Sequence, residues 1–307
     1  MPVFTLRVWA MVKLFDIIQN PFLQVLRVES MPKMLRSCVV RNLESFKGLK
    51  ILGLQAGNSL TPYICRGIVN MQSLVSFSLK YNFTDEMLSA LLACKSTLKV
   101  LDIENSRQIT DLSVPSILEF SGLEELSISR TGISEEGQAH ILINLHNIVR
   151  LPRGDYLCEA LDWIAWELKP RPQPIFKIRN FWSSEVYYFH SLDQIQLVLE
   201  MCPYIQDMLF MFQDRYTCPL SVLGSFNCLT DLELWGGDFY SDDMENVLQQ
   251  IGSNLTKLDL HHFESLDSQA IALISFYCTS LQHLGFSGCG FIEPRTVSEE
   301  FHQTDRW

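Results

Sequence analysis

Basic residues are scarce in this chain: 24 Lys and Arg stand against 35 Asp and Glu, which gives 307 residues a formal net charge of −11. Proteins that bind nucleic acid through its phosphates need a basic surface, so the composition argues against a nucleic-acid partner. No apolar run approaches the roughly 20 residues that span a bilayer. The apolar N-terminus is interrupted by Arg7 and Lys13, which makes it a poor secretory signal. We therefore expect neither nucleic acid nor membrane as a partner.

Paired cysteines are also lacking. The nine cysteines are odd in number, stand singly and form no C-x-x-C pair. This usage indicates reduced thiols and a cytoplasmic or nuclear protein. Without a local histidine beside them, these cysteines are better read as small buried groups than as nucleophiles.

Catalytic and metal-binding patterns are missing as well. His261 and His262 follow Asp259, and alternation places Asp259 and His261 on one face, but the local sequence offers no third partner at a ligand spacing. A solvated polar pair is the simpler interpretation. Gly236 and Gly237 lack the flanking pattern of a phosphate-binding loop. We predict no catalytic, cofactor-binding or metal residues, so the chain is predicted not to be an enzyme.

What the chain does contain is a repeat of the form L-x-x-L-x-L. Examples are LKVLDI from Leu98, LEELSI from Leu123 and LTKLDL from Leu255. The regular copies start at residues 23, 49, 74, 98, 123, 205, 229, 255 and 281, and two degenerate copies start at 148 and 175. A step of this length predicts one strand and one helix per copy, stacked on its neighbours. The predicted fold is α/β: an open, curved leucine-rich-repeat solenoid, or horseshoe, of about eleven repeats, with a single parallel inner sheet and convex helices.

The fourth copy shows the expected orientation of side chains. Alternation in a strand directs Leu98, Leu101 and Ile103 inward. The intervening residues Val100, Asp102 and Glu104 are expected to point outward. Eight residues after the start, several copies carry a small polar residue that can satisfy buried turn groups: Asn82, Ser106, Thr131, Ser183 and Cys289. Helix N-caps are predicted where Ser or Thr precedes an acidic residue: Thr84, Thr110, Ser134 and Ser241.

Three segments carry a resemblance to a known family: ITDLSVPSIL, FTDEMLSALLACKSTLKVL and ISFYCTSLQHLGFSGCGF. They resemble ribonuclease-inhibitor-like leucine-rich repeats, especially the cysteine-containing repeats of F-box/LRR proteins, which place a cysteine just before the next strand. The matching cysteines are Cys94, Cys202, Cys228 and Cys278, with Cys289 at the turn. The resemblance implies a protein-binding horseshoe, often the substrate receptor of a cullin-type ubiquitin ligase. The N-terminal 22 residues differ from that family because they contain no F-box.

The expected organisation has three parts. Residues 1–22 form an N-terminal flank or a trimmed repeat, residues 23–290 form the solenoid, and residues 291–307 form a C-terminal tail. The repeats at 148–204 are irregular: a helix is predicted over 155–168, an extended link over 169–174 and an aromatic run over 181–189. That run either packs on neighbouring repeats or forms an exposed binding loop.

The candidate binding site follows from the outward positions of copies seven to nine. These are Lys177, Arg179 and Phe181; Asp207, Leu209 and Met211; and Asp231, Glu233 and Trp235. Adjacent strands lie about 4.8 Å apart, so Phe181, Leu209, Met211 and Trp235 are predicted to form an apolar patch with Arg179, Asp231 and Glu233 at its rim. An apolar centre with a charged rim is typical of interfaces. In the alternative, the turn FWSS covers the patch.

The predicted function is therefore intracellular protein–protein recognition on the concave face, by a monomer or a subunit of a larger complex and without a cofactor. It includes the substrate receptor that the resemblance implies. A regulatory scaffold or inhibitor-type binder without a ligase link is the main alternative, and a hydrolase is a poorly supported one. The sequence does not identify the partner.

Overall fold

A computed structural model describes residues 22–28, 32–152, 156–169, 172–182, 192–211, 220–236, 241–263 and 266–291. The chain divides into two compact units. Unit 1 comprises residues 1–185 and 193–205, and unit 2 comprises residues 186–192 and 206–307. Within the described ranges, no helix is both long and apolar enough to cross a membrane.

Unit 1 begins with a five-stranded sheet whose order follows the sequence, β1-β2-β3-β4-β5, and all of its neighbouring strands are parallel. These strands are β1 (Val25–Arg27), β2 (Ile51–Leu54), β3 (Ser76–Leu79), β4 (Val100–Asp102) and β5 (Glu125–Ser127), and a later strand, β6 (Asn180–Trp182), lies outside this sheet. Each of the five begins two residues after a predicted repeat start. The repeat register read from the sequence is therefore confirmed for these copies.

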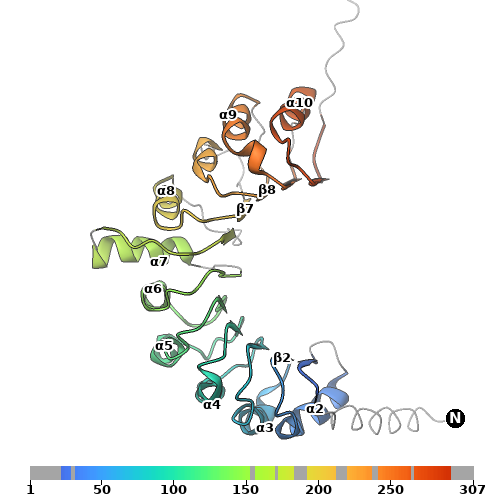
Figure 1. The fold of residues 1–307 in the computed structure, drawn as a ribbon, viewed down its shortest axis with the longest axis vertical. Helices are drawn as coiled ribbons and strands as arrows, with labels where there is room; N and C mark the ends of the chain where they lie inside the picture. The colour runs from blue at the N-terminus through green and yellow to red at the C-terminus, as the bar shows by residue number, and fades with distance from the viewer. Residues whose placement is uncertain are drawn as a thin grey trace, which may run out of the picture. The chain divides into compact units, whose positions relative to one another are not determined.

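The helices of unit 1 alternate with its strands as far as residue 144, and two helices then follow one another with no assigned strand between them in the described residues (Figure 1). They are α2 (Lys33–Arg41), α3 (Thr61–Ile68), α4 (Asp85–Leu91), α5 (Val114–Leu118), α6 (Glu135–Asn144), α7 (Leu157–Trp163) and α8 (Leu192–Met201), whose first residue belongs to unit 2. Short 3-10 turns connect them: η1 (Leu43–Ser45), η2 (Asn58–Leu60), η3 (Leu92–Cys94) and η4 (Asp111–Ser113). A π-helical turn, η5 (Ile164–Leu168), extends α7, so the helix predicted over 155–168 is confirmed from Leu157 onward.

The core of unit 1 is a column of side chains at equivalent positions of successive strands. Leu52 is paired with Phe77, Phe77 with Leu101, and Leu101 with Leu126. All four are buried. Because one side chain from each strand packs on the equivalent residue of the next, burial depends on the stack rather than on any single repeat.

The predicted turn residues satisfy backbone groups as expected. Asn82 donates from Nδ2 to the carbonyl of Ala56 at 2.9 Å, and Ser106 Oγ accepts from the amide of Phe83 at 3.1 Å. Thr131 and Cys289 also donate to carbonyl oxygens, whereas Ser183 lies outside the described residues. The bonds of Asn82, Ser106 and Cys289 connect neighbouring repeats at the turn, where stacking removes backbone groups from water, and the bond of Thr131 stays within its own turn.

The predicted caps are confirmed at two positions and wrong at a third. Thr84 and Ser134 accept hydrogen bonds from the amides of Met87 and Gly137. Thr110 makes no such bond, because the chain continues into the 3-10 turn η4 instead of an α-helix. Its neighbour Asp111 accepts from the backbone and hydroxyl of Ser134, at 2.9 and 2.8 Å, so this carboxylate supports the next repeat's cap. Helix α9 begins at Ser241, and the structure does not describe a cap there.

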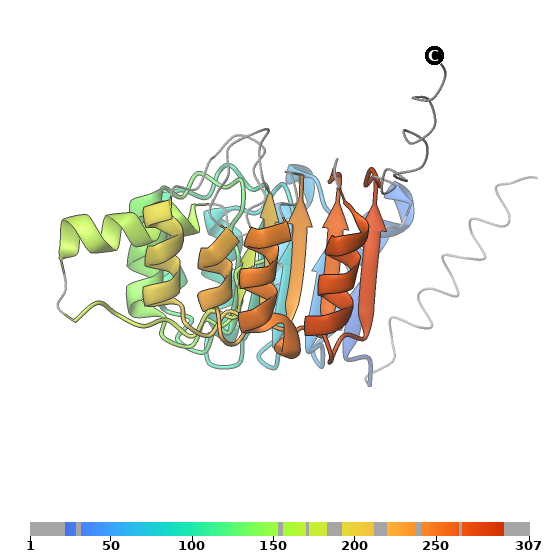
Figure 2. The ribbon, with the colours of Figure 1, turned by 90° about the horizontal axis from the view of Figure 1, so that it is seen from above.

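Unit 2 repeats the same design. Its strands are β7 (Asp207–Met211), β8 (Asp231–Trp235), β9 (Lys257–His261) and β10 (His283–Ser287), each paired in parallel with the next. Its helices are α9 (Ser241–Ile251) and α10 (Ser268–Tyr277), with 3-10 segments η6 (Leu220–Ser225) and η7 (Gly252–Asn254). Figure 2 shows α9 and α10, in orange and red, lying against the strands. Buried Met208, Phe210, Leu232 and Leu234 form the core positions of β7 and β8.

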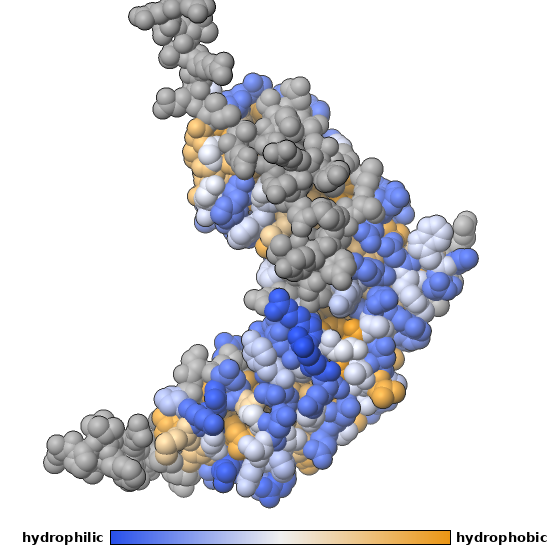
Figure 3. Space-filling view, turned by 180° about the vertical axis from the view of Figure 1, so that it is seen from behind, coloured by the Kyte–Doolittle hydropathy of each residue, from blue (hydrophilic) through white to orange (hydrophobic). Residues whose placement is uncertain are grey.

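Strand β10 is the edge of the described sheet in unit 2. Leu284 and Phe286, at positions that are buried in β8 and β9, are exposed. Figure 3 shows hydrophobic surface at this end of unit 2. The inward register of the last copy is therefore the predicted one, although its apolar side chains are not buried by the described residues.

The prediction of eleven strands in a single sheet is wrong. The described strands number ten and are assigned to two sheets, with the division at the sixth copy. There Arg150 forms only an isolated bridge to Glu125, and Pro152 follows. Proline has no N–H to donate to a ladder, so the sixth copy cannot continue the strand pairing.

A buried side chain replaces the lost pairing. Asn180 Oδ1 accepts from the amide of Leu151 at 3.0 Å, and Asn180 Nδ2 donates to the carbonyl of Leu151 at 2.9 Å. One backbone bond remains beside them, from the amide of Arg179 to the carbonyl of Val149 at 2.9 Å. The sixth and seventh copies are thus joined mainly through an asparagine.

Candidate functional site

The candidate site is the face of the unit 2 sheet that carries the outward side chains, which we call the open face. Strand pairing arranges its residues in three rows: Asp207, Asp231, Lys257 and His283; Leu209, Glu233, Asp259 and Gly285; Met211, Trp235, His261 and Ser287. Side chains at directly paired positions are near neighbours, so each row is a line of potential contacts.

The apolar part of the open face consists of Leu209, Met211 and Trp235. Met211 is paired with Trp235 across β7 and β8, and all three side chains are only partly buried. The structure thus brings these predicted residues together on one face. Asp231 and Glu233 lie beside them on β8, also partly buried, as the predicted rim required.

The prediction for Phe181 is wrong. Its side chain is only 2% exposed and belongs to the core. Strand β6 starts at Asn180, three residues later than the repeat template requires, and alternation fails there because Asn180 and Phe181 are both buried. The same displacement exposes Ile175 and buries Phe176. Lys177 and Arg179 are exposed, as predicted. Most of the aromatic run, from residue 183, lies outside the described residues.

Trp235 is held in place by two contacts. Its indole Nε1 donates to Glu233 Oε1 at 2.6 Å, and its ring stacks on His261 with centroids 4.4 Å apart and planes 16° apart. His262 also approaches the indole, at 5.7 Å between centroids. The tryptophan therefore presents a fixed, partly exposed ring rather than a mobile one.

The charged part of the open face is a network centred on Asp259. Lys257 Nζ lies 2.9 Å from Asp259 Oδ2, and His283 Nε2 lies 2.9 Å from Asp259 Oδ1. Glu233 completes the network, with its carboxylate 4.0 Å from Lys257 Nζ and 3.4 Å from His261 Nε2. Gly285 leaves room for this arrangement, because a Cβ at that position would overlap Asp259 Oδ1.

The network shifts the pKa values of Lys257 and Asp259. The hydrogen bond to Asp259 raises the pKa of Lys257 above its ordinary value, and the charges of Asp259 and Glu233 act in the same direction. Burial favours the protonated form of Asp259, but hydrogen bonds from Lys257 and His283, with their charges, lower its pKa overall. Both groups are therefore charged at neutral pH.

Sequence reasoning missed the contribution of Glu233 to the Asp259–His261 pair. The chain was judged to lack a third partner, yet Glu233, Asp259 and His261 offer ligand atoms that all lie within 4.8 Å of one another. The signal was present in the repeat itself. Residue 233 stands one repeat before residue 259, so parallel stacking places the two side by side.

Unit 1 carries a second polar cluster at the equivalent positions of β3 and β4. Lys80 Nζ lies 3.0 Å from Glu104 Oε2 and 3.4 Å from Asp102 Oδ2, and Ser78 donates to Asp102 at 3.1 Å. Glu104 was predicted to point to solvent but is only 3% exposed. Ser127 and Ser129, at the corresponding outward positions of the fifth copy, are also buried. The outward positions of these copies are therefore partly covered, and at Glu104 the charged side chains fold onto one another.

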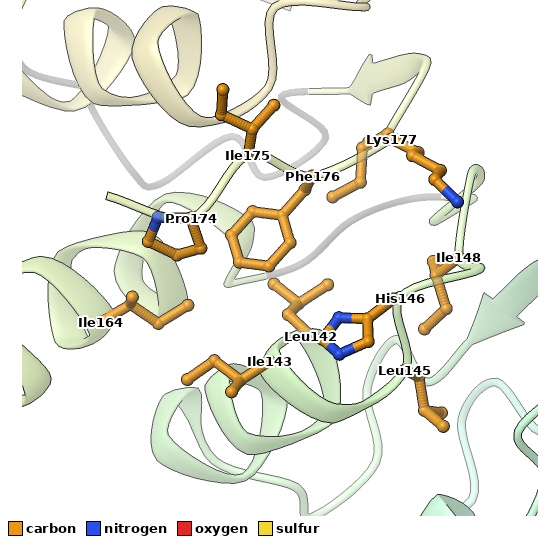
Figure 4. Close-up of a pocket in the computed structure, with 11 residues that line it drawn as sticks. Leu142, Ile143, Leu145, His146, Ile148, Ile164, Pro174, Ile175, Phe176 and Lys177 are labelled. Carbon is orange, nitrogen blue, oxygen red and sulfur yellow. The ribbon is translucent and has the colours of Figure 1, made fainter. Parts of the chain in front are cut away.

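An apolar cavity of about 380 Å³ lies in unit 1, between α6 and the segment preceding β6. Figure 4 shows Pro174 and Phe176 on that segment, facing Leu142 and Ile143 of α6. Ile164 and His146 complete part of its wall. Such a lining suits packing of the irregular repeat, and we assign it no ligand.

Three of the four cysteines that precede a strand fit the predicted packing role. Cys94, Cys202 and Cys278 are buried, and burial raises the pKa of these thiols to about 11, 12 and 11 respectively. A thiol with so high a pKa is protonated at neutral pH and is a weak nucleophile. Cys228 is exposed, so its predicted burial is wrong. The described cysteines are all free thiols.

The architecture described above is the leucine-rich-repeat fold: consecutive parallel strands, one per repeat, backed by helices. Solved structures support this assignment. Rad7, in a complex with Elc1 from yeast, matches with a TM-score of 0.52 and 15% identity over 86% of this chain and 77% of that chain. The likeness at this identity concerns the fold alone.

Two further structures are similar at lower scores. The leucine-rich-repeat-containing protein LegL7 from Legionella pneumophila has a TM-score of 0.45 and 12% identity, over 86% of this chain and 83% of its own. TLR13, in a complex with ssRNA13, has a TM-score of 0.44 and 15% identity over 91% of this chain. The match covers 34% of the TLR13 chain, about a third of its length. No family model and no curated protein matches the sequence.

Proposed function

We propose that this protein recognises a protein partner through the open face of unit 2, with Trp235 at the centre of the contact. The observation that carries the proposal is the partly exposed indole of Trp235, fixed beside Met211 and bordered by Glu233. Tryptophan is enriched among the residues that contribute most to interface affinity, and such residues lie near the centre of an interface.

Rigidity strengthens this assignment. Because Glu233 and His261 already hold the indole, binding does not have to order it. A side chain that loses little conformational freedom retains more of its contact energy as affinity. Leu209 and Met211 have the same advantage in part, because the strand that carries them is fixed by parallel pairing.

Charge indicates the kind of protein surface that fits. Four acidic side chains of the open face, Asp207, Asp231, Glu233 and Asp259, accompany one lysine, Lys257. A partner with basic residues around an apolar centre complements this surface. Such complementarity increases the association rate and the salt dependence of binding more than the final affinity.

Trp235→Ala tests the proposal directly. The partner is first identified by affinity purification and mass spectrometry under reducing conditions, and its Kd is then measured by calorimetry. Truncation of a central tryptophan is expected to cost about 2–4 kcal/mol of binding free energy, so the affinity for the partner should fall at least tenfold. Thermal unfolding should remain cooperative, because Trp235 is not a core residue.

Trp166→Ala is the matched control. Trp166 is 71% exposed on η5 of unit 1, so its loss removes an equally large side chain that is not part of the open face. The affinity of the Trp166→Ala variant for the partner should equal that of the unmodified protein. Equal weakening by both variants, or no weakening by Trp235→Ala in a folded protein, would exclude the open face as the binding surface.

A more specific role is the substrate receptor of a cullin-type ubiquitin ligase, acting in the cytoplasm or nucleus. The observation that favours it is the burial of Cys94, Cys202 and Cys278 just before their strands, as in the repeats of F-box/LRR proteins. Rad7 supports the choice only by its fold and by forming a complex with a protein, Elc1. Recovery of a cullin scaffold with the purified protein is the expected result; a stable partner without a cullin would favour the scaffold or inhibitor role.

A further inference from the structure

A second feature of the open face goes beyond partner recognition and does not depend on it. Glu233, Asp259 and His261 come from two paired strands, and their ligand atoms all lie within 4.8 Å of one another. Two carboxylates and one imidazole are ligands that transition-metal ions accept. Glu233 and His261 are partly buried and Asp259 is 9% exposed, so bulk water screens them less than it would screen a surface cluster.

The spacing suits a tetrahedral ion. Zinc binds oxygen and imidazole nitrogen at about 2.0–2.2 Å, so two ligands of one tetrahedral zinc ion lie about 3.3–3.6 Å apart. His261 Nε2 and Glu233 Oε1 are 3.4 Å apart. The third ligand, a carboxylate oxygen of Asp259, needs only a side-chain adjustment to join them.

The surrounding residues hold these ligands in position. Trp235 Nε1 donates to Glu233 Oε1 at 2.6 Å, and its ring stacks on the imidazole of His261. His283 Nε2 lies 2.9 Å from Asp259 Oδ1, and the missing side chain of Gly285 gives that carboxylate its space. Metal ligands typically have such supporting partners, which orient the ligand and tune its affinity.

Lys257 is the competing cation. Its ammonium contacts Asp259 at 2.9 Å and lies 4.0 Å from Glu233. It is also attracted by Asp207 and is paired in the sheet with Asp231. A metal ion can therefore displace the ammonium toward the acidic residues of its own row, Asp207 and Asp231, without leaving it isolated.

We propose that Glu233, Asp259 and His261 form a binding site for a divalent transition-metal ion of the zinc class, with a fourth position left for water or a group from a partner. Three protein ligands with an open position are the arrangement found at zinc sites that exchange a ligand. Calcium and magnesium fit less well, because they prefer sites composed entirely of oxygen ligands.

Calorimetry with Zn²⁺ on the full chain tests the site. One saturable equivalent is expected for the unmodified protein. Loss of a residue that only supports a metal ligand typically lowers metal affinity about 10–100-fold. Glu233→Gln and His261→Ala change the ligands themselves, so each should lower the Zn²⁺ affinity by at least that much. His146→Ala removes an exposed imidazole from unit 1 and should leave the affinity unchanged. Cooperative thermal unfolding of each variant verifies folding.

A variant that is expected to bind Zn²⁺ more tightly distinguishes a metal site from an effect on folding. Lys257→Met removes the competing ammonium and should tighten Zn²⁺ binding, whereas a variant that only disturbs the fold would weaken it. Co²⁺ distinguishes the ligands, because thiolates give an intense charge-transfer band that nitrogen and oxygen ligands lack. Binding that persists in Glu233→Gln and His261→Ala, a thiolate band, or no saturable binding at all would each overturn the proposal.

Discussion

Alternating side chains in one strand have opposite roles. Leu101 is fully buried in the column that runs through β2 to β5, while its neighbour Asp102 lies on the other face with Ser78 and Lys80. The L-x-x-L-x-L spacing predicts this difference, because strand side chains alternate between faces. A one-residue error in register would exchange the two roles.

Leu101→Ala should therefore be much more destabilising than Asp102→Ala. The first leaves a cavity in the core and should lower the free energy of unfolding by about 2–5 kcal/mol. The second removes a partly exposed ion pair, which is worth about 0–1 kcal/mol. Denaturant titration of both variants measures the difference, and similar losses would show that the strand register is wrong.

The cysteines should differ widely in reactivity. Denatured, unreduced protein is expected to contain nine free thiols. Among the cysteines that the structure describes, exposed Cys228 should react with a thiol reagent first in the native protein, and buried Cys94 and Cys202 last. Labelling followed by peptide mapping gives the order. A count below nine would demonstrate a disulfide and contradict the reducing environment that we expect.

The buried thiols also predict the response to alkaline pH. Burial raises the pKa of Cys94 to about 11 and that of Cys202 to about 12, whereas an unfolded cysteine titrates near about 8.5. The unfolded state therefore loses protons first, so the stabilisation present below about pH 8.5 declines as the pH rises toward 11–12. Urea titrations should show that the free energy of unfolding falls less between pH 8.5 and 11 in Cys202→Ala than in the unmodified protein. An identical fall in both proteins would contradict the role of the buried Cys202 thiol.

At the scale of the element, the sixth copy is where sequence reasoning and structure differ most. The degenerate motif IVRLPR marked the irregularity correctly, but its Pro152 was not recognised as the residue that ends the strand pairing. The replacement by Asn180 could not be predicted, because it depends on a side chain 29 residues away from Leu151. Phe181 was misplaced because alternation fails in β6, where Asn180 and Phe181 are both buried.

Asn180→Ala tests the importance of this replacement. It leaves the amide and carbonyl of Leu151 without the partner that Asn180 provides, at a cost of about 1–3 kcal/mol for each buried group. Asn147→Ala is a suitable control, since that exposed amide makes one bond, to the carbonyl of Ser121. Thermal unfolding should show a large loss of stability for Asn180→Ala and not for Asn147→Ala. Equal stability of the two variants would mean that the asparagine bridge is dispensable.

At the scale of the whole molecule, the repeat period predicted most of the fold. Nine regular starts correspond to nine described strands, and the column of core residues follows from the same spacing. The proposed binding surface was less predictable. Leu209, Met211 and Trp235 lie on one face of the sheet, as the spacing predicts, but the charged network required knowledge of which residues of different repeats become neighbours.

A single repeat should not fold alone. Burial of an aliphatic side chain contributes about 1.5–3 kcal/mol, while ordering the backbone costs about 1–2 kcal/mol for every residue, including the many that bury nothing. A peptide of residues 98–122 should accordingly show the circular dichroism of an unstructured chain. In the full protein, amides of the same residues should be protected from hydrogen exchange. Helical signal in the isolated peptide would contradict the dependence on stacking.

The asparagine bridge between the sixth and seventh copies has a consequence for how this sequence can vary. In the regular copies inside each sheet, such as β2 to β4, strand positions are constrained by backbone pairing on both sides, which disfavours proline there. Where one side chain makes the connection, the constraint moves from a whole strand to a single residue, Asn180. Substitutions around Pro152 should therefore be tolerated in a saturation-mutagenesis screen for folding, while Asn180 should accept almost no replacement. The sixth copy would then contain positions that tolerate substitution, and the seventh copy one position, Asn180, that does not.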